Sequence, residues 1–158
     1  MKWNRHGIET FVSEKEFIDT ALIPLIPLDL QQDPSKAALQ GEYITILAEE
    51  VEKQLTGRVM LLPPYPYKKN AGSVDALVAE LNEWNTYYHD VGMINTIYLT
   101  CDEDLAELNV VSKARVIWMP MVPLNHLEAR QAKGMIREQA SQVLPKIMKI
   151  WQRNQLKE

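Results

Sequence analysis

The sequence predicts an α/β fold, a three-layer sandwich in which helices cover both faces of a mostly parallel sheet of four or five strands. Two observations lead to this prediction. Four apolar runs each break at a proline or an acidic turn, and segments with helical periodicity separate them. Strands that alternate with helices and are apolar throughout are typical of a parallel sheet buried on both faces. The four runs are residues 22–28, 58–62, 94–100 and 115–119.

A short helix is expected before the first strand. Ser13 and Glu16 have the spacing of a capping box, in which a hydroxyl and a carboxylate bond free amides at the start of a helix. The strand itself, residues 21–28, contains Pro24 and Pro27. Each proline removes a donor from the hydrogen-bond ladder, so we expect this strand to lie at an edge, to be irregular or to be short.

A long helix and the second strand follow. Asp33 and Pro34 form a typical helix start, an N-cap followed by proline at the first helical position. Apolar residues recur at helical spacing through about residue 55, and Gly57 ends the helix. The exit from the second strand, residues 63–70, is expected to be extended because proline biases its predecessor away from helix.

The second half of the chain continues this alternation. We expect a helix at 73–92, a strand at 93–100, a short acidic helix to about residue 109, a strand at 115–119 and a long C-terminal helix at about 126–153. The length of 158 residues predicts a single domain, residues 1–158. Right-handed crossovers restrict the strand orders, and we expect the flavodoxin-like order 2-1-3-4.

The composition predicts a cytoplasmic protein. The one cysteine, Cys101, excludes an internal disulfide and favours a reducing compartment. Charges throughout the first 20 residues are unlike a signal peptide. The longest apolar run, residues 21–28, is far shorter than the roughly 20 residues that cross a bilayer. A net charge of −4 disfavours binding to nucleic acid.

The charge is unevenly distributed along the chain. Residues 126–158 hold seven Lys or Arg and three Glu, a net charge of +4, so the rest of the chain carries −8. A basic helix on an acidic body can dock an acidic partner protein or an anionic membrane surface. Lys146 and Lys149 are our candidate contacts. The alternative is an ordinary solvated helix face.

The candidate catalytic residues follow the predicted strands. In open parallel sheets, ligands bind beyond the carboxyl ends of the strands. Asp29, Asp102 and His126 each follow a different strand and could meet at that edge as the general-base or metal site of a small hydrolase. The alternative is that the two aspartates are turn and cap residues.

Other common sites lack a sequence signal. No glycine follows a strand, and neither a GxGxxG motif nor a P-loop occurs, so we expect no nucleotide cofactor. The three histidines are widely separated, and we predict no metal centre. Cys101 opens a helix whose dipole would lower the pKa of a thiol, but the three carboxylates that follow it would raise that pKa.

The loop after the second strand is a candidate binding surface. It contains Tyr65, Tyr67, Lys68 and Lys69, and its prolines preorganise it, which lowers the entropic cost of binding. For the two tyrosines, a surface role and core packing are both open.

Residues 15–28 (KEFIDTALIPLIPL) and the length of the chain resemble an uncharacterised "domain of unknown function" family of short proteins from Gram-positive spore-forming bacteria. The resemblance implies a small cytoplasmic protein with no assigned activity. Members of this family are encoded near the genes of menaquinol–cytochrome c reductase, which implies a link to respiratory-complex assembly.

A fainter similarity is to the creatininase-like amidohydrolases. Residues 22–34 (LIPLIPLDLQQDP), a helix and then VMLLPPYPY are similar to that family's first strand, first loop and second strand. The similarity implies a creatininase-like strand order and a reduced amidohydrolase. It also implies that the metal site is lost, because the first loop has no histidine and the later His-Gly-Gly-Asn motif is absent.

These observations favour a non-catalytic interaction or assembly module that uses the loop at 65–69 and the C-terminal helix. Two alternatives stay open. One is a small hydrolase at the carboxyl edge of the sheet, and the other is a structural homodimer whose stability depends on its concentration.

Overall fold

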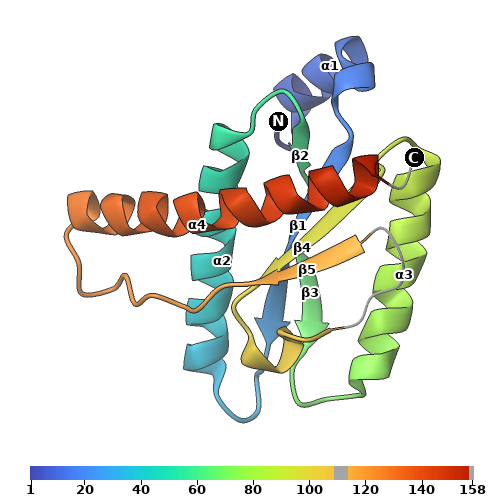
Figure 1. Ribbon diagram of the computed structural model, residues 1–158. Helices are drawn as coiled ribbons and strands as arrows, with labels where there is room; N and C mark the ends of the chain where they lie inside the picture. The colour runs from blue at the N-terminus through green and yellow to red at the C-terminus, as the bar shows by residue number, and fades with distance from the viewer. Residues whose placement is uncertain (109–113, 157–158) are drawn as a thin grey trace.

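Strands and helices alternate along the chain in the computed structural model, which describes residues 1–108 and 114–156 (Figure 1). The α-helices are α1 (Arg5–Ser13), α2 (Pro34–Gln54), α3 (Val74–Asp90) and α4 (Ala129–Gln155), and the short 3-10 helices are η1 (Lys15–Phe17) and η2 (Glu103–Leu105). The strands are β1 (Thr20–Leu28), β2 (Val59–Leu61), β3 (Tyr65–Lys68), β4 (Asn95–Thr100) and β5 (Ala114–Trp118). The first helix begins well before Ser13, which ends it instead of capping it; the cap is Asn4, whose side chain accepts the Gly7 N–H.

The strands form a parallel sheet in the order β2-β1-β4-β5, with β3 beside β1. Leu22 pairs with Leu61, whereas Leu25 pairs with Tyr65. An advance of three residues along β1 therefore corresponds to an advance of four residues along the neighbouring segment. β2 and β3 are therefore two halves of one strand, separated by a one-residue bulge at the prolines between them. With these halves counted as one strand, the order is 2-1-3-4. The predicted α/β fold with a mostly parallel sheet is confirmed.

Strand β1 is central and nine residues long, so the expectation of an edge, irregular or short strand is wrong. The carbonyl of Leu28 accepts the N–H of Lys69, so by alternation the even-numbered residues of β1 face β2 and β3, and the odd-numbered residues face β4. The nitrogen of Pro24 therefore faces the neighbouring strand at the bulge between β2 and β3, where the regular ladder is interrupted. The nitrogen of Pro27 faces the side of β4, but β1 pairs with β4 only as far as residue 24. Both prolines therefore lie where the regular ladder is interrupted.

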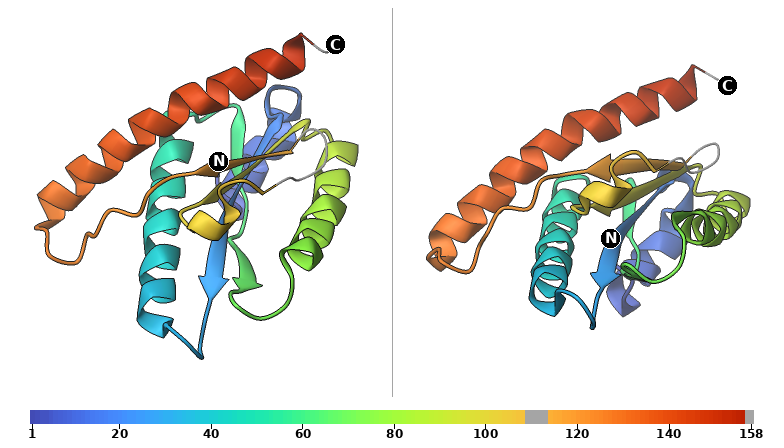
Figure 2. Two further views of the ribbon diagram at one scale, coloured as in Figure 1. Left: turned by 60° about the horizontal axis from the view of Figure 1, so that its bottom comes forward. Right: turned by 90° about the horizontal axis from the view of Figure 1, so that it is seen from below.

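Helices cover both faces of the sheet (Figure 2). Residues of α2 and α4 pack on one face together with Leu22 and Ile97, and residues of α1 and α3 pack on the other with Ile23 and Tyr98. Adjacent residues of one strand thus enter different cores, which is why the strands are apolar throughout.

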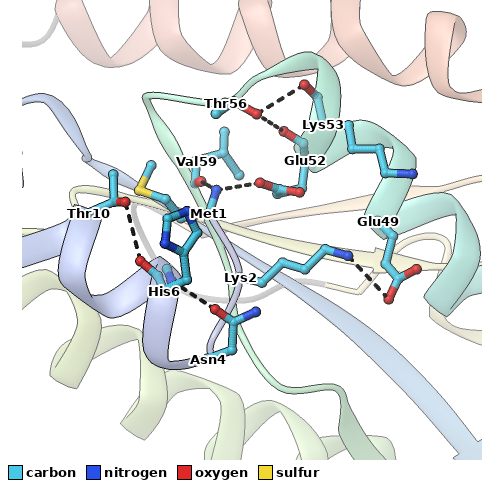
Figure 3. A network of polar contacts seen from close by, with 11 residues as sticks. Met1, Lys2, Asn4, His6, Thr10, Glu49, Glu52, Lys53, Thr56 and Val59 are labelled. Atoms are coloured by element: carbon cyan, nitrogen blue, oxygen red, sulfur yellow. Dashed lines mark hydrogen bonds and ion pairs between the residues drawn. The ribbon is translucent and has the colours of Figure 1, made fainter.

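The segment before α1 lies along the free edge of β2. The α-amino group of Met1 forms an ion pair with Glu52 at 2.5 Å and donates to the carbonyl of Val59 at 2.9 Å (Figure 3). The Leu61 N–H donates to the Met1 carbonyl at 2.7 Å. Gly7 permits this arrangement, because a Cβ at that position would lie 1.9 Å from the Lys2 carbonyl oxygen.

Helix α4 crosses the sheet on the same side as α2 (Figures 1 and 2). Its buried residues begin at Ile136, so the first two turns project past α2. Trp151 fastens the other end, since its Nε1–H donates to the Thr20 hydroxyl at 2.9 Å and the Arg58 guanidinium lies 3.9 Å from the centre of its ring.

Candidate functional site at the carboxyl edge of the sheet

Tyr67, Lys69 and Asp102 form a polar network where β3 and β4 end. The Tyr67 hydroxyl donates to Oδ2 of Asp102 at 2.5 Å, and Nζ of Lys69 lies 2.8 Å from Oδ1 of the same carboxylate. Asp102 is 2% exposed and Tyr67 is 9% exposed. Because β1 lies between β3 and β4, the network ties together two strands that do not pair with each other.

The network holds each of its members in its resting protonation state. Burial alone would raise the pKa of Asp102, but hydrogen bonds from Lys69 and Tyr67 outweigh it and hold the pKa below the ordinary value. Burial alone would lower the pKa of Lys69, but Asp102 raises it. Burial and the bond to Asp102 both raise the pKa of Tyr67. At neutral pH none of the three is poised to transfer a proton.

Asp29 is bound by the loop that it opens. Its Oδ1 accepts the N–H groups of Gln31 at 3.1 Å and Gln32 at 2.9 Å. Its Oδ2 accepts the Asp33 N–H at 3.1 Å and the Asn70 amide at 3.4 Å. These bonds, above all that from Gln32, lower the pKa of Asp29. The carboxylate thus fills the group of N–H donors before α2 that would otherwise attract an external anion.

The structure brings two of the three candidate catalytic residues to one edge. Asp29 and Asp102 are bonded by the consecutive residues Asn70 and Lys69. His126 is exposed on the loop that leads from β5 past α2 to the start of α4 (Figure 1). In residues 1–108 and 114–156, no group of three His, Cys, Asp or Glu could hold a metal ion. The hydrolase hypothesis stays a prediction.

Cys101 is buried beside this network. Its thiol lies 3.5 Å from the carbonyl of Gln40 in α2 and is a donor to it. Burial, reinforced by the charge of Asp102, raises the pKa of Cys101 to about 12. The thiol is therefore protonated at neutral pH and is a poor nucleophile.

The predicted binding loop is mostly strand β3 at an edge of the sheet. Tyr65 donates to Glu80 of α3 at 2.5 Å, and Tyr67 and Lys69 turn toward Asp102. Of the four candidate binding residues, Lys68 is the exposed one. Pro66 suits this position. The Lys69 N–H points toward β1, so by alternation the nitrogen of Pro66 points away from β1. No strand of the sheet lies on that side to receive a hydrogen bond from it.

The other candidate binding residues, Lys146 and Lys149, are exposed on α4. Four further exposed cations lie on the same helix, and in the described part of the chain none of the six forms an ion pair. Two exposed carboxylates, Glu128 and Glu138, lie at its start and on it. The further cations are Arg130, Lys133, Arg137 and Arg153.

Among the described residues, two hollows at the carboxyl edge both involve α2. The larger, of about 400 Å³, is a mainly apolar groove between α2 and the end of β1. The smaller, of about 140 Å³, is lined mainly by polar residues, Gln40 among them. The sequence interpretation missed Gln40. Its position three residues before Tyr43 and seven before Leu47 puts an amide on the apolar face of the helix, and that was the available signal.

The comparisons with known proteins agree on the family. The family described as "Protein of unknown function (DUF2487)" matches residues 9–151. The "Uncharacterized protein YpiF" of Bacillus subtilis (strain 168) is 33% identical over 152 residues, which cover 96% of this chain and 98% of that protein. No solved structure matches. Within the described residues, no helix has both the length and the apolarity needed to cross a membrane. The chain therefore belongs to the DUF2487 family of proteins of unknown function.

Proposed function

We propose that this chain is a non-catalytic interaction or assembly module that docks an acidic partner protein through the exposed face of α4. The observation that carries the proposal is the set of six exposed cations on this helix, none of which has an ionic partner within the described chain. With two exposed carboxylates against six cations, the surface of α4 keeps a net positive charge, and such a surface accelerates encounter with an acidic partner and selects against basic ones.

The chemistry of the carboxyl edge supports a binding role over a catalytic one. The raised pKa of Cys101 leaves too little thiolate for a nucleophile, the lowered pKa of Asp102 makes it a weak base, and the raised pKa of Lys69 makes it a weak acid at neutral pH. The gene neighbourhood of the resembling family suggests the first partners to test, which are acidic surfaces of menaquinol–cytochrome c reductase subunits and their assembly factors.

The test is co-purification from native cells with two charge-reversed variants. Lys146→Glu with Lys149→Glu changes the exposed face of α4, and Lys15→Glu with Lys53→Glu makes the same change in net charge elsewhere. We expect the first pair to lose the partner and the second pair to retain it. Rising salt should weaken the wild-type complex, because exposed charges are screened.

Equal recovery of the partner by both variants would contradict the proposal. A chain that purifies alone and shows concentration-dependent stability would instead indicate the structural homodimer. Native mass spectrometry of the same preparations separates these outcomes, because it reports the mass of every bound species.

A further inference from the structure

The exposed side of α3 carries a cluster of aromatic rings. The Tyr87 ring lies 6.0 Å from that of Trp84, at 89° to it, and 5.7 Å from that of Tyr88. Tyr88 stacks on Trp84 and packs against the core, whereas Trp84 is 43% exposed and Tyr87 is 57% exposed. Val91, one turn after Tyr87, is 40% exposed. Trp84, Tyr87 and Val91 thus form an exposed aromatic patch, and large exposed apolar side chains that gather in this way mark interaction surfaces.

Carboxylates surround the aromatic patch. Glu80 and Glu83 precede Tyr87 by about two turns and one turn, so they lie on the same face of the helix. The Tyr65 hydroxyl holds Glu80 by a hydrogen bond of 2.5 Å, and Glu83 is exposed. Among the described residues, neither carboxylate forms an ion pair. Helix α3 contains four carboxylates and neither lysine nor arginine, so charge complementarity requires a basic partner here.

The chain itself shows how an aromatic ring and a carboxylate together hold an arginine. The Arg58 guanidinium lies 3.9 Å from the centre of the Trp151 ring, and its Nε and Nη2 donate to the two carboxylate oxygens of Asp19 at 3.0 and 3.1 Å. A planar guanidinium can stack on a ring while its edge makes two parallel hydrogen bonds with a carboxylate. A lysine ammonium is a point charge and cannot make both contacts in this way. The aromatic patch with Glu83 offers the same two kinds of group at the surface.

We propose that this surface binds an arginine-bearing basic segment of a partner protein. The guanidinium stacks on the Tyr87 ring, which is the more exposed of the two rings, and its edge bonds the carboxylate of Glu83. Trp84 and Val91 contact the apolar stem of the arginine. The surface lies on the opposite side of the sheet from α4 (Figure 2), so it is separate from the docking function proposed above and does not depend on it.

The test is an NMR titration of the isotope-labelled full chain with two capped peptides, Gly-Arg-Gly-Arg-Gly and Gly-Lys-Gly-Lys-Gly. Both peptides carry the same charge, so general attraction to an acidic surface affects them equally. We expect the arginine peptide to bind at least about threefold more tightly, because stacking and the two parallel hydrogen bonds need a guanidinium. The backbone amides that shift should be those of residues 80–91. Equal affinities, shifts confined to other elements, or no binding of the arginine peptide would each overturn the proposal.

Two variants with matched controls locate the contact. Tyr87→Leu keeps an apolar side chain but removes the ring, and Glu83→Gln removes the charge but keeps the shape; each should weaken binding of the arginine peptide about threefold. Trp3→Leu removes a ring that is 60% exposed outside α3, and Glu42→Gln makes the same charge change on α2. Both controls should leave binding unchanged. If Tyr87→Leu binds the peptide as tightly as the wild type, or if each control weakens it equally, the assignment is wrong.

A second copy of the chain also carries exposed arginines, on its α4. Native mass spectrometry of the wild type and of Tyr87→Leu over a range of protein concentrations separates this occupant from a partner protein. We expect the two chains to have the same oligomeric state at every concentration. A dimer of the wild type that Tyr87→Leu abolishes would make the second copy the occupant and would overturn the assignment to a partner protein.

Discussion

At the scale of single residues, Asp102 stabilises the carboxyl edge in its ionised form. Lys69 and Tyr67 bond the carboxylate in the folded chain, and water bonds it in the unfolded chain, so its pKa is lower when folded than the ordinary 3.8. A carboxyl with a depressed folded pKa contributes stability that is fully present above its unfolded pKa. That contribution is lost as the pH falls from about 3.8 through the lower folded value.

Replacing Asp102 by Asn should reveal this contribution. The amide keeps the shape but cannot pair with the Lys69 ammonium, so we expect the free energy of unfolding at pH 7 to fall by about 2 kcal/mol. The loss should shrink below pH 4, where the wild-type carboxyl also becomes neutral. Urea unfolding of both chains from pH 7 to pH 2 measures the difference. A deficit that does not change with pH would show that the ion pair with Lys69 contributes nothing.

Cys101 provides a second residue-scale prediction. Burial and Asp102 raise its pKa from 9.0 to about 12, so at a given mildly alkaline pH the folded chain holds roughly a thousandfold less thiolate than an ordinary cysteine. Iodoacetamide should therefore label the folded chain very slowly and the urea-unfolded chain rapidly. Fast labelling of the folded chain would mean that the thiol opens to solvent and would reopen the case for a nucleophile.

The sequence predicted the site in part. The fold class is enough to place residues at one edge of the sheet, but the hydrogen bonds between them depend on the register of neighbouring strands. Asp29 and Asp102 follow strands of one parallel sheet, so their arrival at one edge follows from the fold class alone. The pairing of Tyr67 and Lys69 with Asp102 depends on the bulge between β2 and β3, which sets which side chains turn inward. Proline spacing indicated an extended segment there but could not set its register.

At the scale of elements, the helices and strands were predictable where periodicity and caps agree. Asp33 and Pro34 begin α2, and Ser73 caps α3, as local chemistry requires. The placement of β1 at an edge was predicted wrongly. A proline destabilises a central strand only where its missing N–H would have bonded a neighbouring strand. Pro24 faces a bulge and Pro27 faces the space beyond β4, and both are properties of neighbouring strands. Which strands are neighbours depends on the topology of the whole sheet, which the local sequence around the prolines does not contain.

Gly7 and Gly134 form a matched pair for testing how elements pack. A Cβ at Gly7 would lie 1.9 Å from a backbone oxygen, so Gly7→Ala should detach the first residues from β2 and cost about 2 kcal/mol or more. Gly134 lies within α4 with nothing within 4 Å of a Cβ. Gly134→Ala should therefore stabilise the chain by about 0.5–1 kcal/mol, because alanine favours helix. Thermal midpoints of the two variants should move in opposite directions; a shared direction would refute this packing argument.

At the scale of the whole molecule, the chain separates stabilising contacts from exposed charge. At one side of the sheet, Met1 pairs with Glu52, and Trp151 bonds Thr20, so segments far apart in the sequence are fastened to the strands. At the other side, α4 extends past α2, and its first turns contribute no buried residue (Figure 1). The same helix is therefore anchored along its second part and free along its first.

This division predicts a gradient of hydrogen exchange along α4. Residues 129–135 should exchange their amide protons faster than residues 136–152, because opening the first turns exposes no buried side chain, whereas opening the later turns exposes Ile136, Val143 and Ile147. Exchange measured by mass spectrometry on peptides from the two segments checks this. Arg130 and Lys133 lie on the free turns, so a partner that docks on all six exposed cations of α4 should slow exchange at 129–135. Protection confined to residues 136–152 would place the partner at Lys146 and Lys149 and not on the projecting turns.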